Sequence, residues 1–185
     1  MSLLAIHNQS QLLVIDEQTR LAGAMPELEW QQIESNTGRL IKAAAALDVP
    51  VIISEQYPKG LGHTVESLKD GLGENSSLFE KTHFSCCQNT DYKKQLISNN
   101  RKQLVICGME THVCILQTAI DALESGFQVF IIADAVCSRD SQHKENALIR
   151  LQQAGAIISN HESVLFEWLR DARHEQFKFI SSLLK

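Results

Sequence analysis

Four short apolar runs recur along the chain, and none of them alternates with polar residues. They occupy residues 12–15 (LLVI), 51–53 (VII), 104–107 (LVIC) and 129–132 (VFII). A continuous run that is rich in β-branched residues is typical of a strand buried on both faces, as in a parallel sheet covered by helices. A weaker run at residues 156–159 (AIIS) is expected to add a strand at the edge of the sheet.

Helical patterns lie between these runs, so that strands and helices alternate. The expected helices span approximately residues 32–47, 90–98, 111–125, 141–154 and 174–184. This alternation, with right-handed crossovers, predicts an α/β fold, a Rossmann-like three-layer αβα sandwich with a mainly parallel sheet. No linker or internal repeat divides the chain, and its 185 residues fit a single domain over residues 1–185.

The C-terminal stretch carries further apolar side chains whose partner the pattern leaves open. Trp168 and Leu169 precede Phe177, Phe179 and Ile180. These side chains could form an interface between subunits or pack against the sheet. Packing against the sheet is the interpretation that we favour.

The charge and the hydropathy of the chain argue against some classes of partner. The formal net charge is −5, and the basic residues form no cluster that could neutralise a nucleic-acid backbone. No segment reaches about 18 consecutive apolar residues, and the N-terminus lacks the basic and apolar regions of a signal peptide. We therefore expect no nucleic-acid partner, no membrane association and a cytoplasmic location.

The five cysteines are odd in number and lack the C-x-x-C spacing, so no disulfide framework is expected. Cys114 follows the third apolar run by seven residues and would lie in the first turns of the next helix. Backbone N–H groups and the helix dipole stabilise a thiolate there, which predicts a lowered thiol pKa and a nucleophile. The alternative is an inert thiol on the apolar face of that helix. Cys107 and Cys137 are expected to be core thiols, whereas Cys86 and Cys87 fall in an expected loop.

Asp16 follows the first apolar run directly, so its carboxylate is placed at the carboxyl end of a strand, where open α/β sheets bind their ligands. A partly desolvated carboxylate there has the raised proton affinity of a general base, although Asp16 could instead cap the following helix. The local pattern does not distinguish Lys81 from a surface lysine. His112 would lie on the other side of the helix from Cys114, which makes a Cys–His dyad geometrically poor.

Three motifs together resemble the isochorismatase-like cysteine hydrolase family. They are D-E-Q beginning at Asp16, F-E-K ending at Lys81 and G-M-E-T-H-V-C ending at Cys114, and their order and spacing match the family pattern across nearly the whole chain. The segment E-Q-Y-P-K-G-L-G, which begins at Glu55, is similar to that of an uncharacterised isochorismatase-domain branch. The resemblance implies a catalytic triad of Asp16, Lys81 and Cys114, in which the lysine favours the anionic thiol.

The resemblance also implies how the backbone and the surroundings of the triad are built. A cis peptide is expected between Met109 and Glu110, and the backbone N–H groups of Glu110 and Cys114 are expected to face an oxyanion. Nicotinamidases of the family bind a metal through an aspartate and histidines after the second strand, where this chain has S-E-Q-Y-P beginning at Ser54. We therefore expect no metal and no organic cofactor, and the family suggests a homo-oligomer.

Hydrolysis of a small amide-like (C–N) or related acyl substrate, through a thioester on Cys114, is the function that these residues favour. True isochorismatases lack the nucleophilic cysteine, so its presence argues against vinyl-ether cleavage. Two alternatives stay open: a thiol-redox or peroxide-reactive protein, and a small-molecule binding module without turnover. The candidate substrate-lining residues are Gln18, Tyr57, Phe84 and His112.

Overall fold

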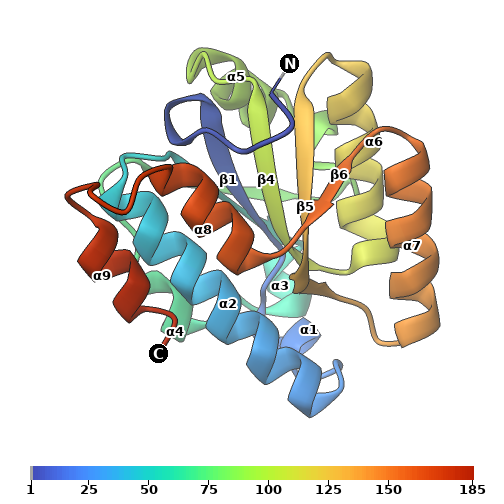
Figure 1. The fold of residues 1–185 in the computed structure, drawn as a ribbon. Helices are drawn as coiled ribbons and strands as arrows, with labels where there is room; N and C mark the ends of the chain where they lie inside the picture. The colour runs from blue at the N-terminus through green and yellow to red at the C-terminus, as the bar shows by residue number, and fades with distance from the viewer. Residues whose placement is uncertain (1) are drawn as a thin grey trace.

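One sheet with only parallel neighbours forms the middle layer of the molecule (Figure 1). In the computed structural model, which describes residues 2–185, the strand order is β3-β2-β1-β4-β5-β6. The strands are β1 (Ser10–Ile15), β2 (Val51–Gln56), β3 (Ser76–Lys81), β4 (Gln103–Met109), β5 (Gln128–Cys137) and β6 (Ile157–Ser159). The predicted α/β class is confirmed, and the weak fifth run forms the expected edge strand, β6.

Helices cover both faces of the sheet (Figure 1). One face carries α2 (Glu27–Ala46), α8 (His161–Leu169) and α9 (Phe177–Ser182), and the other carries α5 (Thr90–Ser98), α6 (Leu116–Glu124) and α7 (Ser141–Gln153). The shorter segments are η1 (His7–Gln9), α1 (Thr19–Ala22), α3 (Pro58–Leu61), α4 (Glu66–Lys69), η2 (Cys86–Gln88) and the π-helical turn η3 (Thr111–Ile115). None of the helices in residues 2–185 is long and apolar enough to cross a membrane.

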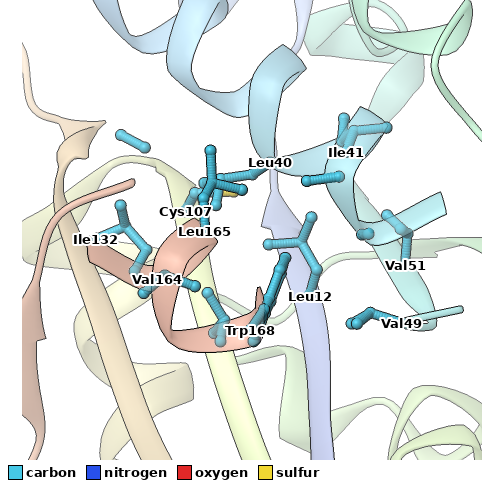
Figure 2. Close-up of a cluster of buried hydrophobic side chains, with 14 of the residues drawn as sticks. Leu12, Leu40, Ile41, Val49, Val51, Cys107, Ile132, Val164, Leu165 and Trp168 are labelled. Carbon is cyan, nitrogen blue, oxygen red and sulfur yellow. The ribbon is translucent and has the colours of Figure 1, made fainter. Parts of the chain in front are cut away.

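The continuous apolar runs are explained by the two layers of helices. Leu12 and Val14 of β1 pack in the cluster beneath α2 and α8, whereas Leu13 and Ile15 pack in the cluster beneath α5, α6 and α7. Successive side chains of a strand point to opposite faces, so each of the residues 12–15 of β1 lies against one layer of helices and is apolar. Figure 2 shows Leu12 among the buried side chains of the first cluster, close to Trp168.

The C-terminal side chains pack against the sheet, as we favoured. Trp168, Leu169 and Ile180 are buried in the same cluster as Leu12, while Phe179 keeps 44% of its surface exposed. The indole N–H of Trp168 also donates to Ser10 Oγ at 3.1 Å. The helix expected at residues 174–184 is shorter, because α9 covers only Phe177–Ser182.

Besides the shorter helical segments, two elements were not predicted. β3 has the sequence SSLFEK and lies at an edge of the sheet, where polar and apolar residues mix because one side meets solvent. α8 was missed because its run of apolar positions is short. Its start does carry a helix signal, since the Asn160 side chain caps it by accepting from Ser163 N at 2.8 Å. β3 matters for function, since it ends at Lys81.

β1 and β4 approach each other closely just before the residues of chemical interest. Gly108 of β4 has φ +114°, and a Cβ atom there would lie 2.1 Å from the carbonyl oxygen of Ile15. Only a residue without Cβ fits this contact and this backbone conformation. Gly108 therefore allows β4 to run beside the end of β1, which places the segment after β4 next to Asp16.

Candidate active site

The carboxyl ends of four neighbouring strands bring the candidate residues together. Asp16 follows β1, Ser54 lies in β2, Lys81 ends β3, and Cys114 lies in η3, which follows β4. The strands are adjacent in the order β3-β2-β1-β4, and parallel strands end at the same edge of a sheet. The three residues of the expected triad thus meet there, although 65 positions separate Asp16 from Lys81.

The Asp16 carboxylate is completely buried, and each of its oxygens has a partner. Oδ2 accepts from Lys81 Nζ at 2.7 Å, and Oδ1 accepts from Ser54 Oγ at 2.7 Å. Burial raises the pKa of Asp16, while the charge of Lys81 and these hydrogen bonds act in the opposite direction. The raised proton affinity expected of Asp16 is present, and its carboxylate does not cap a helix.

The Lys81 ammonium is buried and uses its three protons within the protein. Nζ donates to Asp16 Oδ2 at 2.7 Å, to Gln56 Oε1 at 2.7 Å and to the carbonyl of Phe84 at 3.2 Å. Burial by itself lowers the pKa of Lys81, but Asp16, Cys86 and Cys114 raise it above its ordinary value. Lys81 therefore stays a cation.

Cys114 lies in a widened turn and not in a regular α-helix. Ile115 N bonds to the carbonyl of Glu110 at 3.3 Å, five residues back, and Thr111 Oγ1 bonds to the carbonyl of Cys137 at 2.9 Å. Single π-helical turns of this kind are frequent at functional sites. Only 6% of the surface of Cys114 is exposed.

The predicted lowering of the Cys114 pKa is wrong. Burial raises the pKa of the thiol well above its ordinary value, and the negative charge of Asp16 raises it further, while Lys81 opposes this only in part. The Cys114 thiol lies near enough to the Asp16 carboxylate for the charge of the carboxylate to raise the thiol pKa. The resting site thus contains a protonated thiol beside a carboxylate, so attack by the sulfur requires a base.

The peptide bond between Met109 and Glu110, which joins β4 to η3, is cis. Met109 is buried. The Glu110 carboxylate accepts from Arg139 N at 3.0 Å and from Arg139 Nε at 3.1 Å. The side chain of Glu110 is thereby directed to the segment after β5, and its backbone lies at the start of the turn that carries Cys114.

Gln18 and His112, both expected to line the substrate site, make specific contacts within the protein. Gln18 is buried, and its amide accepts from Gln56 N at 2.7 Å and donates to the carbonyls of Gln56 at 3.1 Å and Gly62 at 2.6 Å. Its side chain thus holds the loop after β2. His112 Nδ1 lies 2.9 Å from Ser138 Oγ, and burial lowers the pKa of His112.

The two aromatic residues expected at the site are exposed. Tyr57 and Phe84 keep 55% and 52% of their surfaces accessible, and the carbonyl of Phe84 binds Lys81. Tyr57 lines a cavity of about 630 Å³ whose wall also includes Lys81 and His83. Asp16 and Cys114 are not in its wall, so this cavity approaches the triad from the lysine side.

Ser54, Gln56 and Cys86 belong to the site but were not predicted. Ser54 and Gln56 lie at the carboxyl end of β2, beside the strand that leads to Asp16, and this edge position is the signal that could have identified them. Cys86 Sγ donates to Ser54 Oγ at 3.4 Å. Cys86 and Cys87 lie in η2 and are buried, so the expected loop is a short helix packed in the core.

The other cysteines fit the core role expected of them. Cys107 and Cys137 are buried, and all five thiols are free.

At the end of β2, Glu55 accepts from Thr64 N at 2.7 Å and pairs with His63 Nδ1 at 2.9 Å. Within residues 2–185, no three histidine, cysteine, aspartate or glutamate side chains are grouped so that they could hold a metal ion.

A six-stranded parallel sheet with helices on both faces defines the protein as an α/β protein of the isochorismatase-like fold. The model of the isochorismatase domain matches residues 10–163. The chain belongs to the isochorismatase family.

Three similar proteins extend this comparison. Isochorismatase family protein 1A of Dictyostelium discoideum is 39% identical over 180 residues, which cover 95% of this chain and 86% of the relative. The structure described as the MAR1 ribonuclease of Caenorhabditis elegans has a TM-score of 0.92 and 38% identity, covering 98% of this chain and 92% of its own. The YcaC gene product of Escherichia coli, described as an octameric hydrolase of unknown specificity, has a TM-score of 0.92 and 26% identity, covering 100% and 90%.

Proposed function

We propose that the protein is a cysteine-dependent hydrolase that cleaves a small amide-like (C–N) or related acyl substrate through a thioester on Cys114. The observation that carries the proposal is the Asp16 carboxylate, which binds the Lys81 ammonium at 2.7 Å and whose charge acts on the nearby Cys114 thiol. A base, a fixed positive charge and a nucleophile close to one another form the arrangement that covalent acyl transfer needs. The roles of Asp16, Lys81 and Cys114 are those that the resemblance to the family implies.

In the first half of the proposed reaction, Asp16 accepts the thiol proton while the sulfur of Cys114 attacks the substrate carbonyl. Because the thiol pKa is raised, deprotonation must accompany the attack. The fixed charge of Lys81 stabilises the negative charge that develops on sulfur. The backbone N–H groups of Glu110 and Cys114 are proposed to bind the oxyanion.

In the second half, protonated Asp16 gives its proton to the departing amine as the C–N bond breaks, which leaves the thioester. Asp16 then takes a proton from a water molecule that attacks the thioester carbonyl. The acid leaves, and the proton returns to the sulfur of Cys114. Lys81 keeps its charge throughout, since its three protons stay bound within the protein.

The raised pKa of Cys114 also favours hydrolysis over the redox alternative. Peroxide reacts with a thiolate, and a thiol held protonated at neutral pH reacts slowly. A binding module without turnover would not need a base beside the thiol. The small exposed fraction of Cys114 indicates a small substrate.

A test is to quench the protein with a panel of small amides, ureido compounds and hydroxamates and to measure its intact mass. We expect an acyl adduct on Cys114 with at least one class, no adduct in Cys114→Ala, and a strongly slowed reaction in Asp16→Asn. Cys137→Ser is the matched control, because it changes a buried thiol outside the triad and should leave the adduct intact. Turnover that persists in Cys114→Ala would overturn the proposal.

We further propose that residues 1–185 act as one domain and that several copies associate. Two hydrophobic clusters lie on opposite faces of the same sheet, which makes each layer dependent on the other. The similar octameric hydrolase of Escherichia coli supports association. The exposed apolar side chains Leu78, Tyr57 and Phe84, on or near the edge strand β3, also support it.

A further inference from the structure

Ser54 holds Asp16 at two points. The carbonyl of Ser54 accepts from Asp16 N at 3.1 Å, and the hydroxyl of Ser54 donates to Asp16 Oδ1 at 2.7 Å. The backbone contact continues the parallel pairing of β1 with β2, in which Ile15 lies opposite Ser54. One completely buried residue thus fixes both the main chain and the carboxylate of the expected base.

The hydroxyl of Ser54 has a single proton, and Cys86 determines where it points. Cys86 Sγ donates to Ser54 Oγ at 3.4 Å, so a lone pair of the hydroxyl is occupied and its proton is left for Asp16. Cys86 is anchored in turn, because its backbone N–H donates to Thr118 Oγ1 at 2.9 Å. Thr118 lies in α6, directly after the turn that carries Cys114.

We propose that Ser54 is a positioning residue for the general base, and that Cys86 orients the Ser54 hydroxyl toward Asp16. The inference rests on the proposed function, since it assigns Asp16 the role of base. The hydrogen bond from Ser54 stabilises the anionic form of Asp16 and fixes the plane of its carboxylate. With Oδ1 bound to Ser54 and Oδ2 bound to Lys81, the carboxylate cannot rotate away from Cys114.

The charged and titratable groups around Asp16 come from four elements. Lys81 belongs to β3, Cys114 to η3 and Cys86 to η2, and Tyr92 of α5 responds to the charge of Asp16 from a greater distance. Only Lys81 among them is a cation. Ser54 is the one neutral donor to Asp16 outside these groups, so its removal changes the protonation of Asp16 without removing a charge.

The test measures how the rate of alkylation of Cys114 by acrylamide depends on pH, read as intact mass. Acrylamide is a small neutral amide that reacts with thiols and needs no knowledge of the substrate. The rate of the wild-type protein should fall at acidic pH, where Asp16 becomes protonated. In Ser54→Ala the midpoint of this fall should move up by about one pH unit, because the anionic form of Asp16 has lost a donor.

Three further variants make the result specific. Cys86→Ala should move the midpoint in the same direction by a smaller amount, whereas Cys86→Ser, which keeps a donor, should stay near the wild type. If Ser54→Ala fails to fold, the comparison of Cys86→Ala with Cys86→Ser still tests the proposal. Ser10→Ala is the matched control, because it removes another buried serine hydroxyl from β1 and should leave the midpoint unchanged.

The outcomes separate the two proposals. Midpoints that stay at the wild-type value in both Ser54→Ala and Cys86→Ala would overturn the positioning role and leave the proposed function intact. A rate and pH profile that are unaffected by Asp16→Asn would overturn the role of Asp16 as base. A purely structural role of Ser54 would change the rate at every pH by the same factor.

Discussion

The Nζ atom of Lys81 lies 2.7 Å from Oδ2 of Asp16, and both side chains are buried. Such a pair costs desolvation on both sides, so its net contribution to stability is small, but each ion depends on the other. Removing either Lys81 or Asp16 alone would therefore leave a buried charge without its partner and destabilise the fold.

Lys81→Met is expected to lower the free energy of unfolding by about 3–5 kcal/mol, because it leaves the Asp16 carboxylate buried without its cation. Urea denaturation at neutral pH measures this change. Adding Asp16→Asn should restore part of the loss, since the unpaired charge is removed. Lys69→Ala, which breaks the exposed Lys69–Glu66 pair, is the control and should stay within about 0.5 kcal/mol of the wild type. A loss in Lys81→Met no larger than that would contradict the prediction.

Glu17 should make the protein less stable as the pH rises. Its side chain is buried, Oε2 has no hydrogen-bond partner, and burial raises its pKa to about 8, with Thr37 opposing the shift and Glu34 adding to it. The unfolded chain releases this proton near its ordinary pKa of 4.5, whereas the folded protein keeps it until about 8. Stability due to this group is therefore full below pH 4.5, falls between 4.5 and 8, and levels off above 8, a change of about 5 kcal/mol.

Glu17→Gln removes this titration, so its advantage in unfolding free energy over the wild type should grow from pH 5 to pH 8.5. Urea denaturation at several pH values measures the difference. Glu145→Gln, an exposed substitution in α7, controls for the change in net charge. A constant difference between Glu17→Gln and the wild type across this range would sink the prediction.

Gly108→Ala is expected to destabilise the fold by roughly 3 kcal/mol or more, because the new Cβ would lie 2.1 Å from the Ile15 carbonyl oxygen. Gly126 has a comparable positive φ, +83°, but nothing lies within 4 Å of an added Cβ. Gly126→Ala should therefore cost only the backbone strain, about 1–2 kcal/mol. Soluble yield and urea denaturation distinguish the two variants, and equal losses would argue against the close contact of β1 with β4.

The net charge of −5 predicts weak affinity for RNA, although a similar structure is described as a ribonuclease. Fluorescence anisotropy with a labelled single-stranded RNA at physiological salt should show no binding tighter than about 100 µM. The labelled RNA should also stay intact on incubation with the protein. Cleavage that is present in the wild type and absent in Cys114→Ala would show that the site acts on RNA and would overturn this expectation.

Association of several copies predicts that light scattering after size-exclusion chromatography gives a multiple of the monomer mass. The apolar side chains exposed near β3 would be protected from solvent in such an assembly. The mass should persist on dilution into the micromolar range. A monomer mass at every concentration would contradict the proposal.

Sequence patterns predicted the strands that are buried on both faces, because burial on both faces forces a continuous apolar run, as in β1. β3 shows the opposite case: it lies at an edge, and its residues SSLFEK do not form such a run. Lys81 at its end was therefore recognisable only through resemblance to a family. Ser54 gave no signal beyond its place at the carboxyl end of β2, since its importance comes from the Asp16 side chain that follows the neighbouring strand.

The sequence by itself determined the parallel α/β layers, the placing of Asp16 at the end of a strand and that of Cys114 at the start of the next helix. These features follow from periodicity and from the chain order of short segments. Only the tertiary structure decided that the side chains of Asp16, Lys81 and Cys114 are buried close to one another. It also decided that the pKa of the Cys114 thiol is raised and not lowered. The reason is that burial of Cys114 and the charge of Asp16 depend on groups distant in sequence. Together they raise the thiol pKa by more than the position of Cys114 at the start of a helix lowers it.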